Sequence, residues 1–588
     1  MKFMMNEFSL IKKVINTALG KYPADLLLKN CNLVDVFTRE IFKTNISIVS
    51  GRIASICEIE YSSKETLECD GYYAVPGLID AHIHLDSTLL TPSQLAKIIL
   101  PHGTTTVLID PMEIANVLGL KGIRLLLEEA WKTPLKTFVQ ISSRVPTAPG
   151  LETTGATLGL KEVMKILEWE NTIALGELDP SKVIPPKNEH LKKVIAAKKL
   201  NKIRVGHAAG LSGKELNAYI AAGLCDDHEC VNAQEALERL RLGMGIAIRE
   251  GSSERNLEEL IKVAVEYRID SSNLFFCTDD KHPNDIIQEG HIDYNVRKAI
   301  KLGLDPIKAI QIATINCAKH FRIDDKVGII APGRIADIIL VKDLKEFKPE
   351  IVIANGEIVA KNGKFLKDLP MLKWPKWAMN TVKLRRRLKP SDFVLKSKKQ
   401  EQRVRVIQII EDQIINKGTY ADLSVKNNEV QVDLENDILK IACVERHKRT
   451  GRITLAFVKG FNLKDGAIGS SVAHDHHNIV VVGTNNLDMA VAVNSIADMH
   501  GGLIVVKQGK VLEKLELPIA GLMSTLNAKD VIERLESLNN SVKMLGCKLK
   551  SPFMTLSFIS LPTVPELGLT DKGLIDVKSH RIVDVKIE

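Results

Sequence analysis

The stretch Pro76-Gly-Leu-Ile-Asp-Ala-His-Ile-His84 closes an apolar run with two histidines that are separated by one residue. Successive side chains of a β-strand point to opposite sides, so an H-x-H pair in a strand presents both imidazoles on one side. Imidazole is a common ligand of divalent transition metals. Such a pair alone is weak evidence for a metal site, so the hypothesis depends on whether further ligand residues follow along the chain.

Strand-like apolar runs alternate with helical patterns through the middle of the chain, for example the helical segments Gly213–Ala221 and Asn256–Glu266. This alternation predicts parallel βαβ units. Eight strands in about 250 residues is the size of a TIM-type barrel, so we predict an α/β fold with a (β/α)8 metallo-dependent hydrolase barrel over residues 71–325. The predicted strands are Tyr73–His84, Thr104–Asp110, Thr137–Ser143, Thr172–Asp179, Lys202–His207, Leu224–His228, Gly245–Arg249 and Asn273–Asp279.

Metal-ligand side chains stand at the carboxyl ends of five of these strands, the face where such barrels build active sites. They are His82 and His84 on the first strand, Glu177 on the fourth, His207 on the fifth, His228 on the sixth and Asp279 on the eighth. Three or four imidazoles with two carboxylates form a ligand set for one or two divalent metals.

Each of these residues also has a structural interpretation. Glu177 could be a loop carboxylate, His207 and His228 could be partly buried polar residues, and Asp279 and Asp280 could cap the following turn. Their joint placement on one rim favours the metal site, although the pattern leaves open whether Asp279 or Asp280 is the ligand.

A two-metal centre would suit hydrolysis, because bound metals lower the pKa of a shared water and polarise the bond under attack. Glu177 can bridge two cations and offset their repulsion. Asp279 can bind one metal, accept a proton from the attacking hydroxide and pass it to the leaving group.

Two β-rich segments flank the barrel in the sequence. We expect residues 1–70 and 326–380 to form a small β-sandwich domain, preceded by a helix over Phe8–Gly20. Residues 381–588 are expected to form a C-terminal mixed α/β domain. In it, Val404–Lys417 and Ala528–Asn539 are predicted helices.

Composition narrows the class of protein. The chain has 588 residues, too many for one core, and it lacks the roughly 18 consecutive apolar residues of a membrane span. Nine scattered cysteines do not suggest a disulfide framework, and with no signal-peptide pattern the expected location is cytoplasmic. Much of the net charge of +8 lies in 383–389 and 396–399, interpreted as a solvated linker, so no nucleic-acid or membrane partner is expected.

Several motifs together resemble the amidohydrolase superfamily and, within it, the adenine deaminases. Beside the H-x-H segment, these are His82-Ile-His-Leu-Asp-Ser87, Glu113-Ile-Ala-Asn-Val-Leu-Gly119, Gly176-Glu-Leu178, Gly206-His-Ala208, Asp226-Asp-His-Glu229, Cys277-Thr-Asp-Asp-Lys-His-Pro283, Ser471-Val-Ala-His-Asp-His-His-Asn-Ile479 with Gly483-Thr-Asn485, and Pro518-Ile-Ala-Gly-Leu-Met-Ser524. The resemblance covers about residues 10–580.

This resemblance implies hydrolytic deamination of adenine to hypoxanthine and ammonia by a metal-activated hydroxide, a purine salvage reaction. It implies two divalent ions, manganese or iron with zinc as a further option, and a homodimer or larger homo-oligomer. One metal would be held by His82, His84 and Asp279, the other by His207 and His228, with Glu177 between them. The expected catalytic residues are Glu177, Asp279 and His228, and the expected substrate contacts are Glu113, Ser87 and Asp280.

The sequence departs from the family pattern at two places. Met112 stands where family members generally have a histidine, and His476 stands where they have a serine. The segment His474–His477 could either reach over the metal rim or form a local turn.

Two other functions are also compatible with the sequence. The chain could be an amidohydrolase that acts on a cyclic amide or related C–N bond, or a barrel without catalysis.

Overall fold

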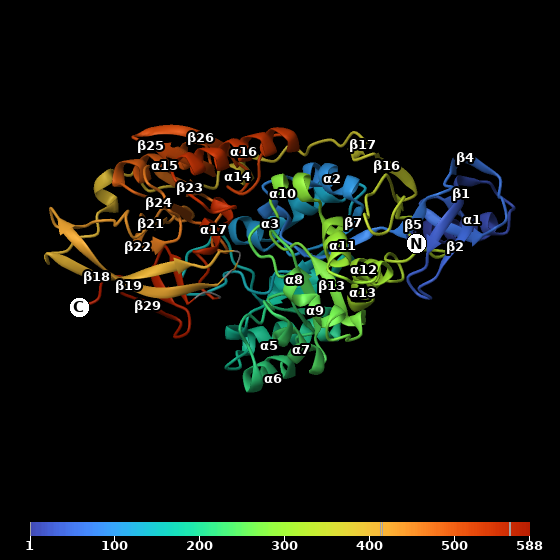
Figure 1. Cartoon of the computed structure of the whole chain (residues 1–588), viewed down its shortest axis with the longest axis horizontal. Helices are drawn as coiled ribbons and strands as arrows, with labels where there is room; N and C mark the ends of the chain where they lie inside the picture. Colours follow the sequence, from blue (N-terminus) through green and yellow to red (C-terminus); the bar gives the residue numbers. More distant parts are fainter. Residues whose placement is uncertain (1, 412, 414, 564–565) are drawn as a thin grey trace.

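The computed structural model describes residues 2–411, 413, 415–563 and 566–588. Figure 1 shows three parts side by side: a sheet near the N-terminus, a central barrel, and a C-terminal region that holds the end of the chain. We call them the flanking sheet, the barrel and the C-terminal region (residues 381–588).

The barrel consists of eight parallel strands, and the predicted (β/α)8 fold is confirmed. Five strands pair in the order β10-β9-β8-β7-β6, and three pair in the order β11-β12-β13. The Cys225 amide donates to the Arg204 carbonyl at 2.9 Å between the two groups, and the Asp279 amide donates to the His82 carbonyl at 2.9 Å on the other side. The strands are β6 (Leu78–Ile83), β7 (Thr104–Ile109), β8 (Lys136–Ile141), β9 (Thr172–Leu178), β10 (Ile203–Gly206), β11 (Asp226–Asp227), β12 (Gly245–Arg249) and β13 (Leu274–Cys277).

Helices follow the barrel strands and cover them, which explains why strands such as β7 and β12 are buried along their whole length. None of the described helices has both the length and the apolar character needed to cross a membrane. The helices are α2 (Pro92–Ile99), α3 (Met112–Ala130), α4 (Leu160–Leu167), α5 (Asn188–Lys199), α6 (Gly213–Ala221), α7 (Ala233–Arg241), α8 (Leu257–Leu260), α9 (Lys262–Val265), α10 (Pro283–Glu289), α11 (Ile292–Lys301), α12 (Pro306–Ala313) and α13 (Ile315–His320).

The flanking sheet joins the two segments on either side of the barrel in the sequence, because β14 pairs antiparallel with β5. Its order is β17-β16-β15-β14-β5-β1-β2-β3, with β4 beside β1, and Leu28, Ile46 and Ile353 are among its buried core residues. Helix α1 (Lys2–Ala18) packs on β3 and β2. The strands are β1 (Ala24–Val34), β2 (Ile41–Val49), β3 (Arg52–Cys57), β4 (Ser63–Glu68), β5 (Tyr73–Pro76), β14 (Ile338–Val341), β15 (Ile351–Ala354), β16 (Glu357–Lys361) and β17 (Lys364–Phe365).

The C-terminal region is built on a second nine-stranded sheet, in the order β20-β19-β18-β22-β21-β24-β23-β25-β26. Its strands are β18 (Glu401–Ile409), β19 (Asn416–Lys426), β20 (Glu429–Val430), β21 (Ile438–Val444), β22 (Ile453–Lys459), β23 (Ala467–Ser470), β24 (Ile479–Gly483), β25 (Gly502–Lys507) and β26 (Lys510–Glu516). Helices α15 (Asn486–Asp498) and α16 (Ala528–Met544) pack on its last strands, and α17 (Pro552–Phe558) contacts β23 and β24. A short sheet of β27 (Leu567–Thr570), β28 (Gly573–Asp576) and β29 (Arg581–Val583) follows.

Of the two helices predicted in this region, Ala528–Asn539 is confirmed and lies within α16. The predicted helix over Val404–Lys417 is wrong, because β18 occupies Glu401–Ile409 and pairs antiparallel with β19. Val404 and Val406 are buried while Arg403 is exposed, an alternation typical of a strand with one face on a core. Residues 412 and 414 of this prediction lie outside the described residues.

Candidate metal centre

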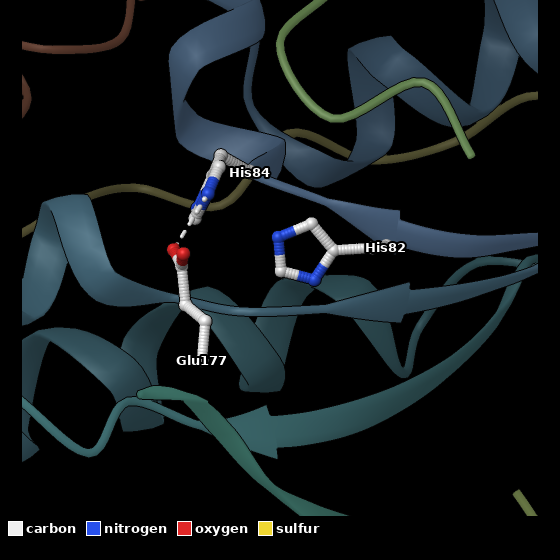
Figure 2. A group of neighbouring side chains, drawn as sticks. All are labelled: His82, His84 and Glu177. Atoms are coloured by element: carbon white, nitrogen blue, oxygen red, sulfur yellow. Dashed lines mark ion pairs between the residues drawn. The ribbon is translucent and has the colours of Figure 1, made fainter. Parts of the chain in front are cut away.

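The two histidines of the H-x-H segment lie at the carboxyl end of β6, beside Glu177 on β9 (Figure 2). His84 Nε2 is 3.3 Å from Glu177 Oε1. Gln140 Nε2 donates to the Ala81 carbonyl at 2.7 Å, so the Gln140 oxygen is free to accept from His82 Nδ1 at 2.6 Å. This bond places the proton of His82 on Nδ1 and leaves the lone pair on Nε2, the arrangement of a metal-ligating histidine.

A second group of side chains shares Glu177. His207 Nδ1 lies 2.6 Å from Glu177 Oε2, and His228 Nε2 lies 3.6 Å from the same oxygen. The two imidazole nitrogens are 3.3 Å apart. Glu177 therefore stands between two histidine pairs, with one oxygen toward each.

Asp279 lies beside the first pair, because it follows β13, the strand next to β6 where the barrel closes. Its Oδ1 is 3.4 Å from His84 Nε2 and 3.8 Å from His82 Nε2, and its Oδ2 is 2.8 Å from Nη1 of Arg249. Asp280 also lies within reach of a shared ion, in a group with His84 and Asp279. Asp279 pairs with both histidines of the H-x-H segment, whereas Asp280 pairs with His474.

Burial and neighbouring charges set the protonation of the groups. Burial, together with His228 and His84, lowers the pKa of His82 to about 4, which keeps this imidazole neutral at neutral pH. Burial alone would raise the pKa of Glu177, but Arg144 and His207 hold it well below its usual range. A neutral imidazole and an ionised carboxylate are the forms that bind a metal.

These residues fit a pair of divalent cations. His82, His84 and Glu177 offer ligand atoms that all lie within 4.8 Å of one another, and so do Glu177, His207 and His228. Among the described residues, His82 Nε2 of the first group and His207 Nε2 of the second have no hydrogen-bond partner although both are buried. Buried polar atoms without hydrogen-bond partners are rare and call for an explanation, and a shared cation at each group would supply one.

A cavity lies over these groups. The barrel residues that line it are His84, Met112, Arg144, Glu177, His207, His228, Glu229, Asp279 and Asp280, and the C-terminal region adds His474, Asp475, Phe558 and Leu561. Ser87 is not among the described residues that line the cavity, and its hydroxyl donates to the His84 carbonyl at 2.7 Å. Glu113 is fully buried behind the cavity wall.

The segment His474–His477 of the C-terminal region reaches this cavity. His474 Nδ1 is 3.3 Å from Glu113 Oε1, its Nε2 is 3.8 Å from Asp280 Oδ1, and its ring stacks on Phe558 at 5.0 Å between centroids. Burial would lower the pKa of His474, but Asp280 and Glu113 raise it to about 10. The two carboxylates therefore favour the protonated form of His474, in which Nε2 carries a hydrogen.

The other two histidines of this segment point elsewhere. His477 Nε2 is hydrogen-bonded to Glu113 Oε2. His476 Nδ1 accepts from the Asn478 amide at 3.0 Å, and the residue is not one of the described cavity-lining residues. His476 therefore does not stand in for the family histidine that Met112 replaces in the cavity wall.

Sequence reasoning missed three charged residues at the site. Two of them, Arg144 and Glu229, line the cavity. The third is Arg249, whose Nη1 lies 2.7 Å from Glu229 Oε1 and 2.8 Å from Asp279 Oδ2. All three stand at or just beyond the ends of predicted strands. The strand-end rule that predicted the metal ligands would also have singled out these three residues, had it been applied to every charged residue type.

Comparisons with known proteins agree with this geometry. The family model described as "Amidohydrolase family" matches residues 73–359, and the one described as "Adenine deaminase C-terminal domain" matches residues 413–581. A protein named adenine deaminase from Desulforamulus reducens is 51% identical over 586 residues, which is 100% of each chain. Proteins of the same name from Kosmotoga olearia and Moorella thermoacetica are 42% and 40% identical, each over 98% of both chains.

Proposed function

The chain belongs to the adenine deaminase family, and from this premise we propose that it hydrolyses adenine to hypoxanthine and ammonia. One observation supports the proposal most directly: two buried histidine pairs share Glu177 at the floor of a cavity that the C-terminal region completes.

The proposed metal ligands are His82, His84 and Asp279 for one ion and His207 and His228 for the other, with Glu177 between them. Manganese, iron and zinc all accept imidazole and carboxylate ligands, and manganese or iron is the proposed choice. Two bound cations would supply hydroxide at neutral pH and offset the negative charge that develops during attack.

Asp279 is the proposed proton carrier. Arg249 holds its Oδ2, which leaves Oδ1 facing the histidines where the attacking water would stand. As the water oxygen adds to C6 of adenine, Asp279 accepts the water proton and then delivers it to the exocyclic nitrogen. The C6–N bond breaks and ammonia leaves. His228, which lies in one group with Glu229 and Asp279, helps to hold the water in place.

Of the expected substrate contacts, Asp280 lines the cavity and is proposed to contact substrate, with His474 as an additional contact; Ser87 and Glu113 are proposed to act indirectly, Ser87 through its hydrogen bond to the His84 carbonyl. The His474 ring lies between Glu113 and Asp280, and among the described residues its buried Nε2 has no hydrogen-bond partner. This N–H can donate to a ring nitrogen of the purine. Glu113 would act by fixing the His474 ring from behind, because Glu113 itself is not among the described cavity-lining residues.

The test is the ultraviolet absorbance of adenine incubated with protein whose bound manganese has been quantified. The spectrum should move to that of hypoxanthine with release of one ammonia per adenine. A protein carrying two manganese ions that leaves adenine unchanged but opens a cyclic amide would contradict the proposed substrate.

A further inference from the structure

One buried arginine connects the proposed metal centre to the C-terminal region. Arg144 follows β8, and its side chain is 1% exposed. Its Nη2 lies 2.9 Å from Glu177 Oε2, and its Nη1 donates to Asp475 Oδ2 at 3.0 Å. The two amino groups of a single guanidinium thus contact the proposed bridging carboxylate and a carboxylate of the C-terminal region.

Asp475 is itself held from the barrel side. The Thr147 hydroxyl donates to Asp475 Oδ2 at 2.6 Å, so this oxygen accepts from two barrel residues. Asp475 is buried, and a buried charge is tolerated only where it is paired and hydrogen-bonded. Removing the charge of Asp475 would take away the ion pair at Nη1 of Arg144 and leave only neutral partners there, such as the Thr147 hydroxyl at 3.4 Å, so the guanidinium would be held less firmly beside Glu177.

We propose that Arg144 and Asp475 form a positioning pair: Asp475 fixes the guanidinium, and the guanidinium holds the Glu177 carboxylate with Oε1 toward His84 and Oε2 toward His207, the orientation that the two proposed metal groups would need. The C-terminal region then sets the metal affinity of the barrel through Asp475, which pairs with Arg144 and Thr147 rather than with a proposed metal ligand. This inference rests on the proposed metal centre, and Arg144 and Asp475 act through Glu177. Groups that orient metal ligands commonly change metal affinity by about 10- to 100-fold when they are removed.

The C-terminal region offers a matched control. Asp571 is also buried, and it accepts from the amide and the hydroxyl of Thr153 in the barrel, at 2.8 and 2.7 Å. It therefore ties the same two parts of the molecule together, and its side chain pairs with Thr153 and Arg452 and not with Arg144. Asp475→Asn and Asp571→Asn each remove one such carboxylate, but only the first one alters the contact to Glu177.

The experiment measures binding of Mn²⁺ alone to the metal-free full chain, by titration calorimetry and by the electron paramagnetic resonance signal of free Mn²⁺. Asp475→Asn should weaken Mn²⁺ binding by about 10- to 100-fold, whereas Asp571→Asn should stay within about twofold of the original protein. Equal losses in the two variants would show that Asp475 only holds the parts together, and an Asp475→Asn protein with unchanged Mn²⁺ affinity would also overturn the proposal.

Two further measurements keep the outcome clear. If Asp475→Asn does not fold, Arg144→Lys takes its place, because an ammonium group lacks the planar fork that reaches both carboxylates. Arg144→Lys should then weaken Mn²⁺ binding by about 10- to 100-fold. A chain that binds Mn²⁺ but leaves adenine unchanged contradicts the proposed function, while the comparison of Mn²⁺ affinities still decides the positioning pair.

Discussion

The molecule carries two nine-stranded sheets on opposite sides of its barrel, and they relate to the cavity in different ways (Figure 1). None of the described residues of the flanking sheet lines the cavity, whereas the C-terminal region supplies His474, Asp475, Phe558 and Leu561. The two sheets have the same number of strands, but only the C-terminal region has described loop and helix residues that reach the rim of the barrel.

The contacts explain the difference. The flanking sheet continues directly into the barrel, because β5 leads into β6, and Lys136 on β8 pairs with Asp337 before β14 at 2.7 Å. The C-terminal region instead places the loop between β23 and β24 against the strand ends, where His474 and Asp475 meet barrel carboxylates and arginine. One sheet supports the barrel, and the other completes its site.

The largest expected effect concerns the barrel alone. Removal of metals with a chelator should abolish adenine turnover, because without cations the pKa of the attacking water returns from about 7 toward about 15.7. Adding Mn²⁺ back should restore turnover, measured by absorbance at fixed protein concentration. Turnover that survives in protein shown to contain no metal would contradict the proposed metal centre. The comparison of the two sheets, which concerns their roles at that centre, would then lose its basis.

Next in size is the exchange of Asp279 for asparagine. The amide cannot accept the water proton, so kcat should fall by about 10²- to 10⁴-fold. Asp280→Asn is the matched control, and its loss should be smaller and appear mainly in KM. A larger kcat loss for Asp280→Asn would assign the proton transfer to Asp280 instead and would move the reacting centre closer to His474.

A smaller loss is expected from the C-terminal region. His474→Asn should lower kcat/KM for adenine by about 10- to 100-fold, the value of one charged hydrogen bond, with the metal content unchanged. His500→Asn alters an exposed histidine of the same region and should have no effect. If His474→Asn matches the original protein, the C-terminal region covers the site without contacting substrate, and the contrast between the two sheets becomes one of shape only.

The smallest effect on turnover is expected from the flanking sheet. Ile46 is fully buried in its core, and Ile46→Ala should lower the free energy of unfolding by about 2–5 kcal/mol. The folded fraction should keep the original kcat/KM. Chemical denaturation and steady-state assays check both parts, with exposed Ile59→Ala as the neutral control. A drop in kcat at full folding would show that the flanking sheet also influences the site.

Much of the barrel could be predicted from the sequence, because period and residue type carry the signal locally. All eight predicted strands overlap β6 to β13, and the six predicted ligand residues converge in groups that share Glu177, His84, His228 or Asp279. A parallel strand buried on both faces is apolar throughout, so the polar residue at its end stands out in the sequence.

The wrong helix over Val404–Lys417 shows where local patterns fail. Val404, Val406 and Ile407 satisfy a helical spacing and a strand alternation at once, and the pairing of β18 with β19 and β22 decides between them. Valine and isoleucine favour a pleated, half-buried surface, but that surface exists only after distant strands have come together.

The barrel strands, their ends and the polar side chains on the rim could be predicted from sequence alone, because the strand and helix periods leave a local pattern of apolar and polar residues. The contacts between these side chains and distant groups became visible only in the folded molecule: Glu113 with His477, Asp280 with His474, and Arg144 with both Glu177 and Asp475. A hydrogen bond or ion pair depends on separation in space, and residues 331 positions apart, such as Arg144 and Asp475, leave no local pattern that records their contact.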